Sequence, residues 1–134
     1  MTDKKITAPG IYAVRCVWAK ADNIGAKETP AFRLLLVRHD DSEKVDATIW
    51  NTERTQDRLK RICQTLKAEY PPQASDFVGK KANIDLTFKP NEKNPDQPWP
   101  EVLNWMPYDT TKELIATPEP DANEPQDSGE DVPF

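Results

Sequence analysis

Aromatic and guanidinium side chains alternate with apolar residues in the first half of the chain. Trp50 closes the run KVDATIW, and Arg15 and Arg33 lie in two earlier runs of similar alternation. An indole face can stack on a nucleobase, and a guanidinium group can hold a phosphate; sites for single-stranded nucleic acid combine the two. A second interpretation stays open, in which Trp50 covers the rim of the core and the arginines are solvated, with Asp46 as a nearby partner.

A polar, proline-rich stretch later in the chain carries another candidate for stacking. Trp99 lies between Pro98 and Pro100 in the loop NEKNPDQPWP. There it serves either as a platform for a base or as an anchor that packs on the prolines. Lysines flank or lie within this loop and an earlier one, namely Lys20, Lys27, Lys89 and Lys93. Each lysine alone is equally consistent with simple solvation. Their joint placement at two loops favours contacts with phosphates.

The residues that enzymes and metal sites usually need are scarce. The chain has one histidine, His39, and two cysteines, Cys16 and Cys63, with no CxxC or HxxxH pair. A zinc site would have to recruit carboxylates. Neither a glycine-rich phosphate loop nor a sequence cluster of Ser, His and acid groups occurs. We expect no enzymatic activity, no metal and no cofactor; a nuclease whose carboxylates converge only in space is the remaining enzymatic alternative.

Hydrophobic periodicity predicts the elements that must position these side chains. Strands are expected at residues 10–21, 31–39, 44–51, 80–90 and 101–108, and one helix over roughly 53–69. An all-β domain with a single helix between the third and fourth strands has the element order of the OB-fold, a five-stranded Greek-key barrel. The loops after its first and fourth strands border the usual ligand cleft. We therefore expect residues 1–110 to form an OB-fold domain that binds single-stranded nucleic acid.

The second and third strands predict a specific register across the turn at 40–43. It places Leu34 opposite Ile49 in the core. The same register places Arg33 opposite Trp50 on the outer face. Both candidate ligand-binding side chains therefore point away from the core.

The same alternation sorts the other large side chains. Trp18 and Trp105 are in phase with neighbouring apolar residues, so we expect both in the core. Val17, Leu35 and Val37 point outward, where they form a surface between two copies of the chain or lie beneath a loop. A homo-oligomer is thus one of two open interpretations.

Charge divides the chain into two parts. In total, 18 Lys and Arg oppose 23 Asp and Glu, and the net charge of −5 argues by itself against a nucleic-acid binder. After Lys112, however, there are seven acids and no basic residue, so residues 1–112 carry a net charge of +2. The acids and prolines of residues 111–134 predict a disordered tail. Such a tail should compete with DNA phosphates for the domain, and less so as salt rises.

The chain ends in SGEDVPF, an acidic run closed by an aromatic side chain and the terminal carboxylate. A pocket with an apolar floor and a basic rim would accept this end; a tail that serves only solubility is the alternative, and it leaves Phe134 unexplained. GEDVPF resembles the acidic tip of bacterial single-stranded-DNA-binding proteins, which recruits replication, recombination and repair proteins. The resemblance assigns partner binding to Asp131, Val132, Pro133 and Phe134, with Val132 where isoleucine is usual.

The domain carries a broader resemblance. The segments FRLLLVRHD, IWNTERTQDRLKRIC and DFVGKKANIDL are similar to small OB-type proteins that phages encode for replication or recombination. Together the two resemblances imply a sequence-tolerant protein that coats single-stranded DNA and recruits DNA-processing enzymes. The alternative is an acidic adaptor or inhibitor of such an enzyme that binds no DNA itself, in keeping with the net charge of −5.

The expected location is the cytoplasm of a bacterial host cell. No apolar run approaches the roughly 20 residues that span a bilayer. The start, MTDKKITAPG, lacks the apolar stretch of a secretory signal. Two cysteines also cannot form the multi-bridge framework of a small secreted domain. We therefore expect a soluble protein without a membrane partner.

Overall fold

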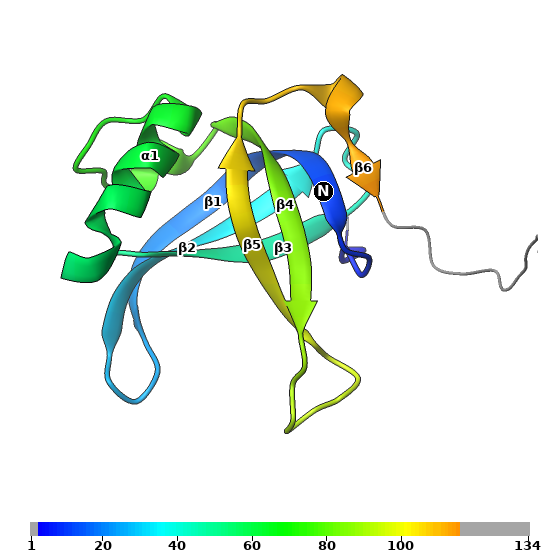
Figure 1. The fold of residues 1–134 in the computed structure, drawn as a ribbon, viewed down its shortest axis with the longest axis horizontal. Coiled ribbons are helices and arrows are strands. Elements are labelled where there is room, and N and C mark those ends of the chain that lie inside the picture. Colours follow the sequence, from blue (N-terminus) through cyan, green and yellow to red (C-terminus); the bar gives the residue numbers. More distant parts are fainter. Residues whose placement is uncertain (1–2, 116–134) are drawn as a thin grey trace, which may run out of the picture.

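The structure is a computed structural model, and it describes residues 3–115. This part is mostly antiparallel β-sheet with one α-helix (Figure 1), which confirms the predicted all-β class with a single helix. The strands are β1 (Gly10–Ile24), β2 (Thr29–Arg38), β3 (Lys44–Trp50), β4 (Lys81–Lys89), β5 (Trp99–Met106) and β6 (Leu114–Ile115). The helices are the 3-10 turn η1 (Glu53–Thr55), α1 (Gln56–Leu66), and two further 3-10 turns, η2 (Ala74–Phe77) and η3 (Thr110–Lys112).

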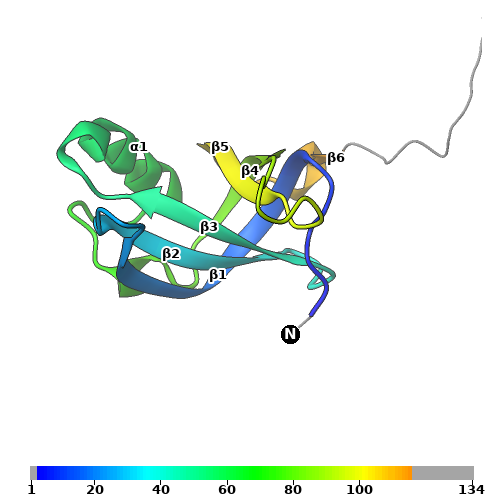
Figure 2. The same cartoon turned by 90° about the horizontal axis from the view of Figure 1, so that it is seen from below.

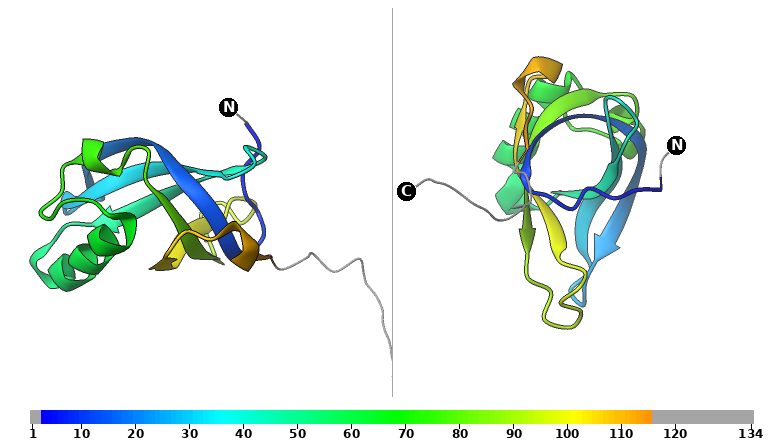
Figure 3. Two further views of the ribbon diagram at one scale, coloured as in Figure 1. Left: turned by 90° about the horizontal axis from the view of Figure 1, so that it is seen from above. Right: turned by 90° about the vertical axis from the view of Figure 1, so that its right-hand side faces the viewer.

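The strands form one curled sheet. Its order is β3-β2-β1-β4-β5, with β6 also paired to β1, and these strand pairs are all antiparallel. β1 is 15 residues long, so its first part can pair with β4 and its second part with β2. The end-on view in Figure 3 shows the resulting curl, which brings the edge strands β3 and β5 close together. Within residues 3–115 no backbone ladder joins these two edges, so the sheet is open along this seam.

The core fills the inside of the curl. Alternate strand residues are fully buried there, among them Tyr12, Val14, Leu34, Leu36, Ile84 and Leu86. α1 lies at the end of the sheet toward which β3 runs (Figure 2) and buries Leu59, Ile62, Cys63 and Leu66, which share one face of a helix. Trp105 of β5 is also buried, as its alternation predicts.

The pairing of β2 with β3 differs from the predicted register by two residues. Arg33 lies opposite Thr48 and not Trp50, and Leu34 is likewise not opposite Ile49. A shift of two residues leaves every side chain on the same face of the sheet. Leu34 and Ile49 are therefore still buried, while Arg33 and Trp50 are exposed.

The shift arises because the turn lies one residue earlier than predicted. The backbone N–H of Arg38 donates to the carbonyl of Glu43 at 2.9 Å, so residues 39–42 form the loop. Asp41 adopts a left-handed conformation there, with φ 62°. Aspartate tolerates this conformation better than most residues, which favours the four-residue turn at 39–42 over the predicted one of equal length at 40–43.

A β-bulge in β1 overturns the prediction that Trp18 is a core residue. Cys16 pairs with Leu36, but Trp18 pairs with Leu35, so Val17 is an extra residue with no partner of its own. An extra residue inverts the alternation of the strand beyond it. Trp18 is therefore 47% exposed on the outer face.

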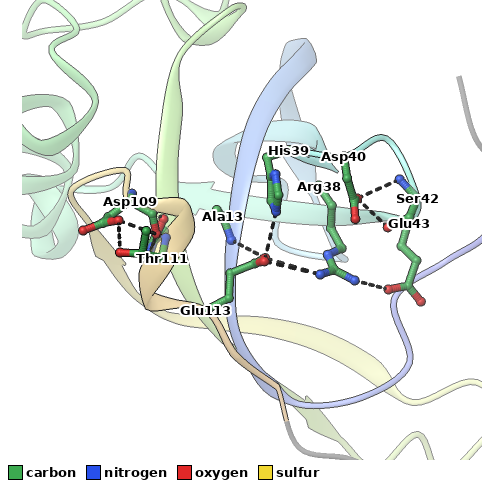
Figure 4. A network of polar contacts seen from close by, with 10 residues as sticks. Ala13, Arg38, His39, Asp40, Ser42, Glu43, Asp109, Thr111 and Glu113 are labelled. Atoms are coloured by element: carbon green, nitrogen blue, oxygen red, sulfur yellow. Dashed lines mark hydrogen bonds and ion pairs between the residues drawn. The ribbon is translucent and has the colours of Figure 1, made fainter.

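The C-terminal end of the described chain is pinned to β1. β6 pairs with the start of β1, and a carboxylate oxygen of Glu113 accepts a hydrogen bond from the N–H of Ala13 at 2.9 Å. The same carboxylate lies 3.4 Å from Arg38 and 3.0 Å from Nε2 of His39 (Figure 4). Residues 111–115 are thus folded against the sheet, and Leu114–Ile115 form part of it, although they were predicted to lie in the tail.

Candidate nucleic-acid interface

A cleft of about 440 Å³ lies between β3 and β5, beside the first turn of α1. Because no backbone ladder closes the seam between these two edge strands, side chains from both strands line it. Its aromatic, charged and hydroxyl-bearing lining residues are Thr48, Trp50, Thr55, Arg58, Lys89, Trp99, Glu101 and Trp105. The rest of the lining is mainly apolar, as is usual for ligand sites.

Both tryptophans that the sequence analysis assigns to stacking line this cleft. Trp50 is the last residue of β3 and is 42% exposed, whereas Trp99 is the first residue of β5 and is 61% exposed. Trp99 pairs with Lys89, so it belongs to a strand and not to the loop in which it was predicted. The two indoles therefore reach the cleft from opposite edges of the sheet.

Arg58 is a cation of the cleft that the sequence analysis missed. Its Nη2 donates to the carbonyl oxygens of Val102 and Leu103, at 3.1 and 3.3 Å. β5 is an edge strand, so the guanidinium group satisfies carbonyls that lack a neighbouring strand. The only signal for this contact in the sequence is that Arg58 lies next to Leu59, a residue on the buried face of the helix. The signal is weak, because charged residues on a helix usually face solvent.

Lys89 supplies the second positive charge of the cleft. Its Nζ lies 3.0 Å from Oε2 of Glu101, and 63% of its side chain remains exposed. An exposed ion pair of this kind is weak, so a phosphate can compete for the ammonium group. Among the described lining residues, two cations thus oppose one carboxylate.

Lys20 and Arg33 lie on the outer face beside the cleft. Lys20 pairs with Arg33, and Arg33 pairs with Thr48. These three residues form one row of side chains across three strands. Nη1 of Arg33 is 3.4 Å from Oδ2 of Asp22. A hydrogen bond from the next residue's backbone N–H and a second one from Arg33 lower the pKa of Asp22, so this carboxylate is ionised at neutral pH. The row lies two residues from Trp50 along β3.

Arg15 is not brought to the cleft. It forms an ion pair with Asp41 in the turn after β2, rather than with Asp46. Its neighbour Val37 is completely buried, so Val37 is not an outward surface residue as predicted, while Leu35 is partly buried.

Lys27 and Lys93 are exposed in the loops after β1 and β4. Both loops project from the same side of the sheet, as the views in Figures 1 and 3 agree. Neither lysine lines the cleft itself.

The two cysteines and the histidine do not line the cleft. Burial raises the pKa of the thiols of Cys16 and Cys63, which therefore remain protonated at neutral pH. His39 contacts Glu113 and does not line the cleft. Among residues 3–115, no group of three or more His, Cys, Asp and Glu side chains is placed to hold a metal ion.

No protein-family model matches this chain, and no curated protein matches it significantly. Among the described residues, no helix has the length and apolar character needed to cross a membrane. The proposed partner-binding residues 131–134 lie outside the described residues.

Proposed function

We propose that the protein binds single-stranded DNA with little sequence preference, in the cleft between β3 and β5. The observation that carries this proposal is the pair of exposed indoles, Trp50 and Trp99, on opposite edges of one cleft with Arg58 and Lys89 beside them. Every base has a face that can stack on an indole, and every phosphate attracts a cation. This set of side chains therefore suits a strand of any sequence.

We also propose that the domain is an OB-fold. The strand order, the position of α1 between β3 and β4 in the chain, and the closeness of β3 and β5 all support it. OB-folds bind oligonucleotides over strands two and three and the loops after strands one and four. Here those loops carry Lys27 and Lys93, which would extend the path of the strand.

In this proposal the C-terminal residues 131–134 recruit enzymes of replication, recombination or repair to the coated strand. Support comes from the sequence, which presents an aromatic side chain and a carboxylate at the end of an acidic segment. The protein would act without catalysis of its own, in the cytoplasm of a bacterial host, as phage-encoded proteins of this type do.

Titration of the full chain with oligo(dT) tests the proposal, with tryptophan fluorescence as the signal. We expect quenching, because stacking on a base quenches indole emission. The affinity should fall as salt rises, with a log–log slope of about −0.7 for each phosphate contact. Unchanged fluorescence together with no salt-dependent binding would contradict DNA binding and would favour the acidic adaptor, for which the net charge of −5 is the supporting feature.

A further inference from the structure

We propose that the bound strand continues from the cleft across the outer face of β3, β2 and β1, where Trp18 stacks a further base. This inference rests on the proposed DNA binding and adds a second stacking site to it. The fold turns Trp18 away from the core, although the alternation of the sequence predicts its burial.

The bulge in β1 is what presents Trp18. Cys16, before the bulge, is 3% exposed, whereas Trp18, after it, is 47% exposed. An indole left in water forgoes the free energy that burial would provide. Bulges re-aim side chains and are common beside binding sites. The neighbour of Trp18 on β2 is Leu35, which is partly buried and gives the indole an apolar floor.

The strand register connects Trp18 to the cleft. Leu35 joins Trp18 to Asp46 in one row, and the next row contains Lys20 and Arg33. Trp50 lies in the row after that, where the outer face meets the cleft. From strand geometry the two tryptophans are roughly 15 Å apart. A few nucleotides can span this distance, within the site size of about 4 to about 16 nucleotides for one OB-fold.

The charges on this face indicate how Trp18 would contribute. Lys20 and Arg33 are opposed by Asp22 and Asp46, so the face has no net charge. Asp22 is already paired with Arg33, whereas Asp46 is exposed in the same row as Trp18. A strand crossing here therefore gains little from phosphate attraction, and its affinity comes from stacking on Trp18. Stacking adds little to the salt dependence of binding.

The experiment measures affinities of the full chain for labelled oligo(dT) of about 4 to about 16 nucleotides. Wild-type affinity should rise with length until the strand reaches Trp18. Trp18→Ala should bind the shortest strands as the wild type does and the longest about tenfold more weakly. Its salt slope should stay the same. Trp18→Phe, which keeps an aromatic face, should recover most of the loss, and thermal unfolding checks that each variant is folded.

Asp46→Asn is a second variant that tests the path. Because Asp46 is exposed, this substitution should not disturb the core. Removal of this carboxylate should tighten binding of long strands at low salt and leave short strands unaffected, because only long strands pass the Trp18 row. Equal effects on short and long strands would contradict the proposed path.

Three results are distinguishable. If Trp18→Ala matches the wild type at every length while Trp50→Ala binds weakly, the outer path is wrong and the cleft stands. If the wild type binds no oligonucleotide, the proposed function fails and the path fails with it. If Trp18→Ala changes only the oligomeric state in sedimentation, Trp18 lies between copies of the chain, and the path is overturned.

Discussion

Trp50 and Trp99 come from two edge strands that share no backbone ladder, so both indoles remain accessible from the cleft. Trp50→Ala and Trp99→Ala should each weaken oligo(dT) binding by about 1–3 kcal/mol, because each removes one stacked base. Fluorescence anisotropy measures this loss. Tyr108→Ala is the matched control, since Tyr108 is exposed but does not line the cleft.

Protein stability separates this result from the alternative interpretation of Trp50 as a residue that covers the rim of the core. Trp50 is 42% exposed, so its removal should leave the cooperative thermal transition in place. A variant that loses binding only because it unfolds would indicate a packing role and would contradict the assignment to stacking.

Lys89 should act through charge and not through stacking. Lys89→Gln removes one phosphate contact, so the log–log salt slope of oligo(dT) binding should become shallower by about 0.7. Lys112→Gln, an exposed change of the same kind outside the cleft, should leave the slope unaltered. Equal slopes for the wild type and Lys89→Gln would show that Lys89 holds no phosphate.

At the scale of elements, Asn83 ties β4 to the segment that leads into η3. Its side chain is buried and exchanges two hydrogen bonds with the backbone of Asp109, at 2.8 and 2.9 Å. Asn83→Ala leaves both backbone groups without these partners and should lower the free energy of unfolding by about 1–3 kcal/mol. Urea denaturation measures this loss. Asn94→Ala, in the exposed loop after β4, should change stability little, and equal losses for both variants would contradict the role of Asn83.

Asp109 also makes the start of η3 sensitive to acid. Hydrogen bonds from the hydroxyl and then the N–H of Thr111 lower the pKa of Asp109. A lowered folded-state pKa means that the stabilisation is present above the ordinary carboxyl pKa and is lost as pH falls through the folded-state pKa. In Asp109→Asn, stability should therefore decline less steeply on acidification. Urea midpoints between neutral pH and about pH 3 test this; parallel curves for wild type and variant would contradict it.

Alternation and helical spacing were sufficient to predict the main strands and the helix, since these signals are local in sequence. They also predicted correctly which faces carry Arg33, Trp50 and Trp105. The bulge at Val17 and the exact position of the turn, 39–42 instead of 40–43, could not be predicted, because both depend on pairing with another strand. The alternation of β1 therefore misplaced Trp18, whereas the face of Trp50 is unaffected by a register error of two residues.

The cleft itself was predictable only in part. Trp50, Trp99 and Lys89 were identified from residue type and position, and the structure places all three on its lining. Arg58 was not identified from the sequence, because its role depends on the carbonyls of an edge strand that lies far away in sequence. Arg15 was assigned to phosphate contact from alternation alone, which gives the face of a strand but not the position along it.

At the scale of the whole molecule, the described part of the chain includes β6 in the sheet, so we expect the acidic segment to begin after it. Removal of residues 116–134 should leave the thermal transition unchanged, whereas removal of residues 113–134 also deletes β6 and the Glu113 contacts to β1 and Arg38. The longer deletion should therefore unfold at a lower temperature in calorimetry. Equal transition temperatures for the two truncated chains would show that β6 contributes no stability.

The shorter deletion also tests the electrostatic role of the acidic segment. It removes six acids and no basic residue, so oligo(dT) binding should tighten at low salt and converge with that of the full chain as salt rises. Equal affinities at low salt would contradict competition between this segment and DNA.

Ultraviolet cross-linking of the full chain to oligo(dT), followed by identification of the modified peptides, tests the central claim most directly. The proposed site predicts adducts on the peptides that contain Trp50 and Trp99, and their loss in the double variant Trp50→Ala, Trp99→Ala. An absence of adducts from wild type, or adducts confined to residues outside the cleft such as Tyr108, would contradict it.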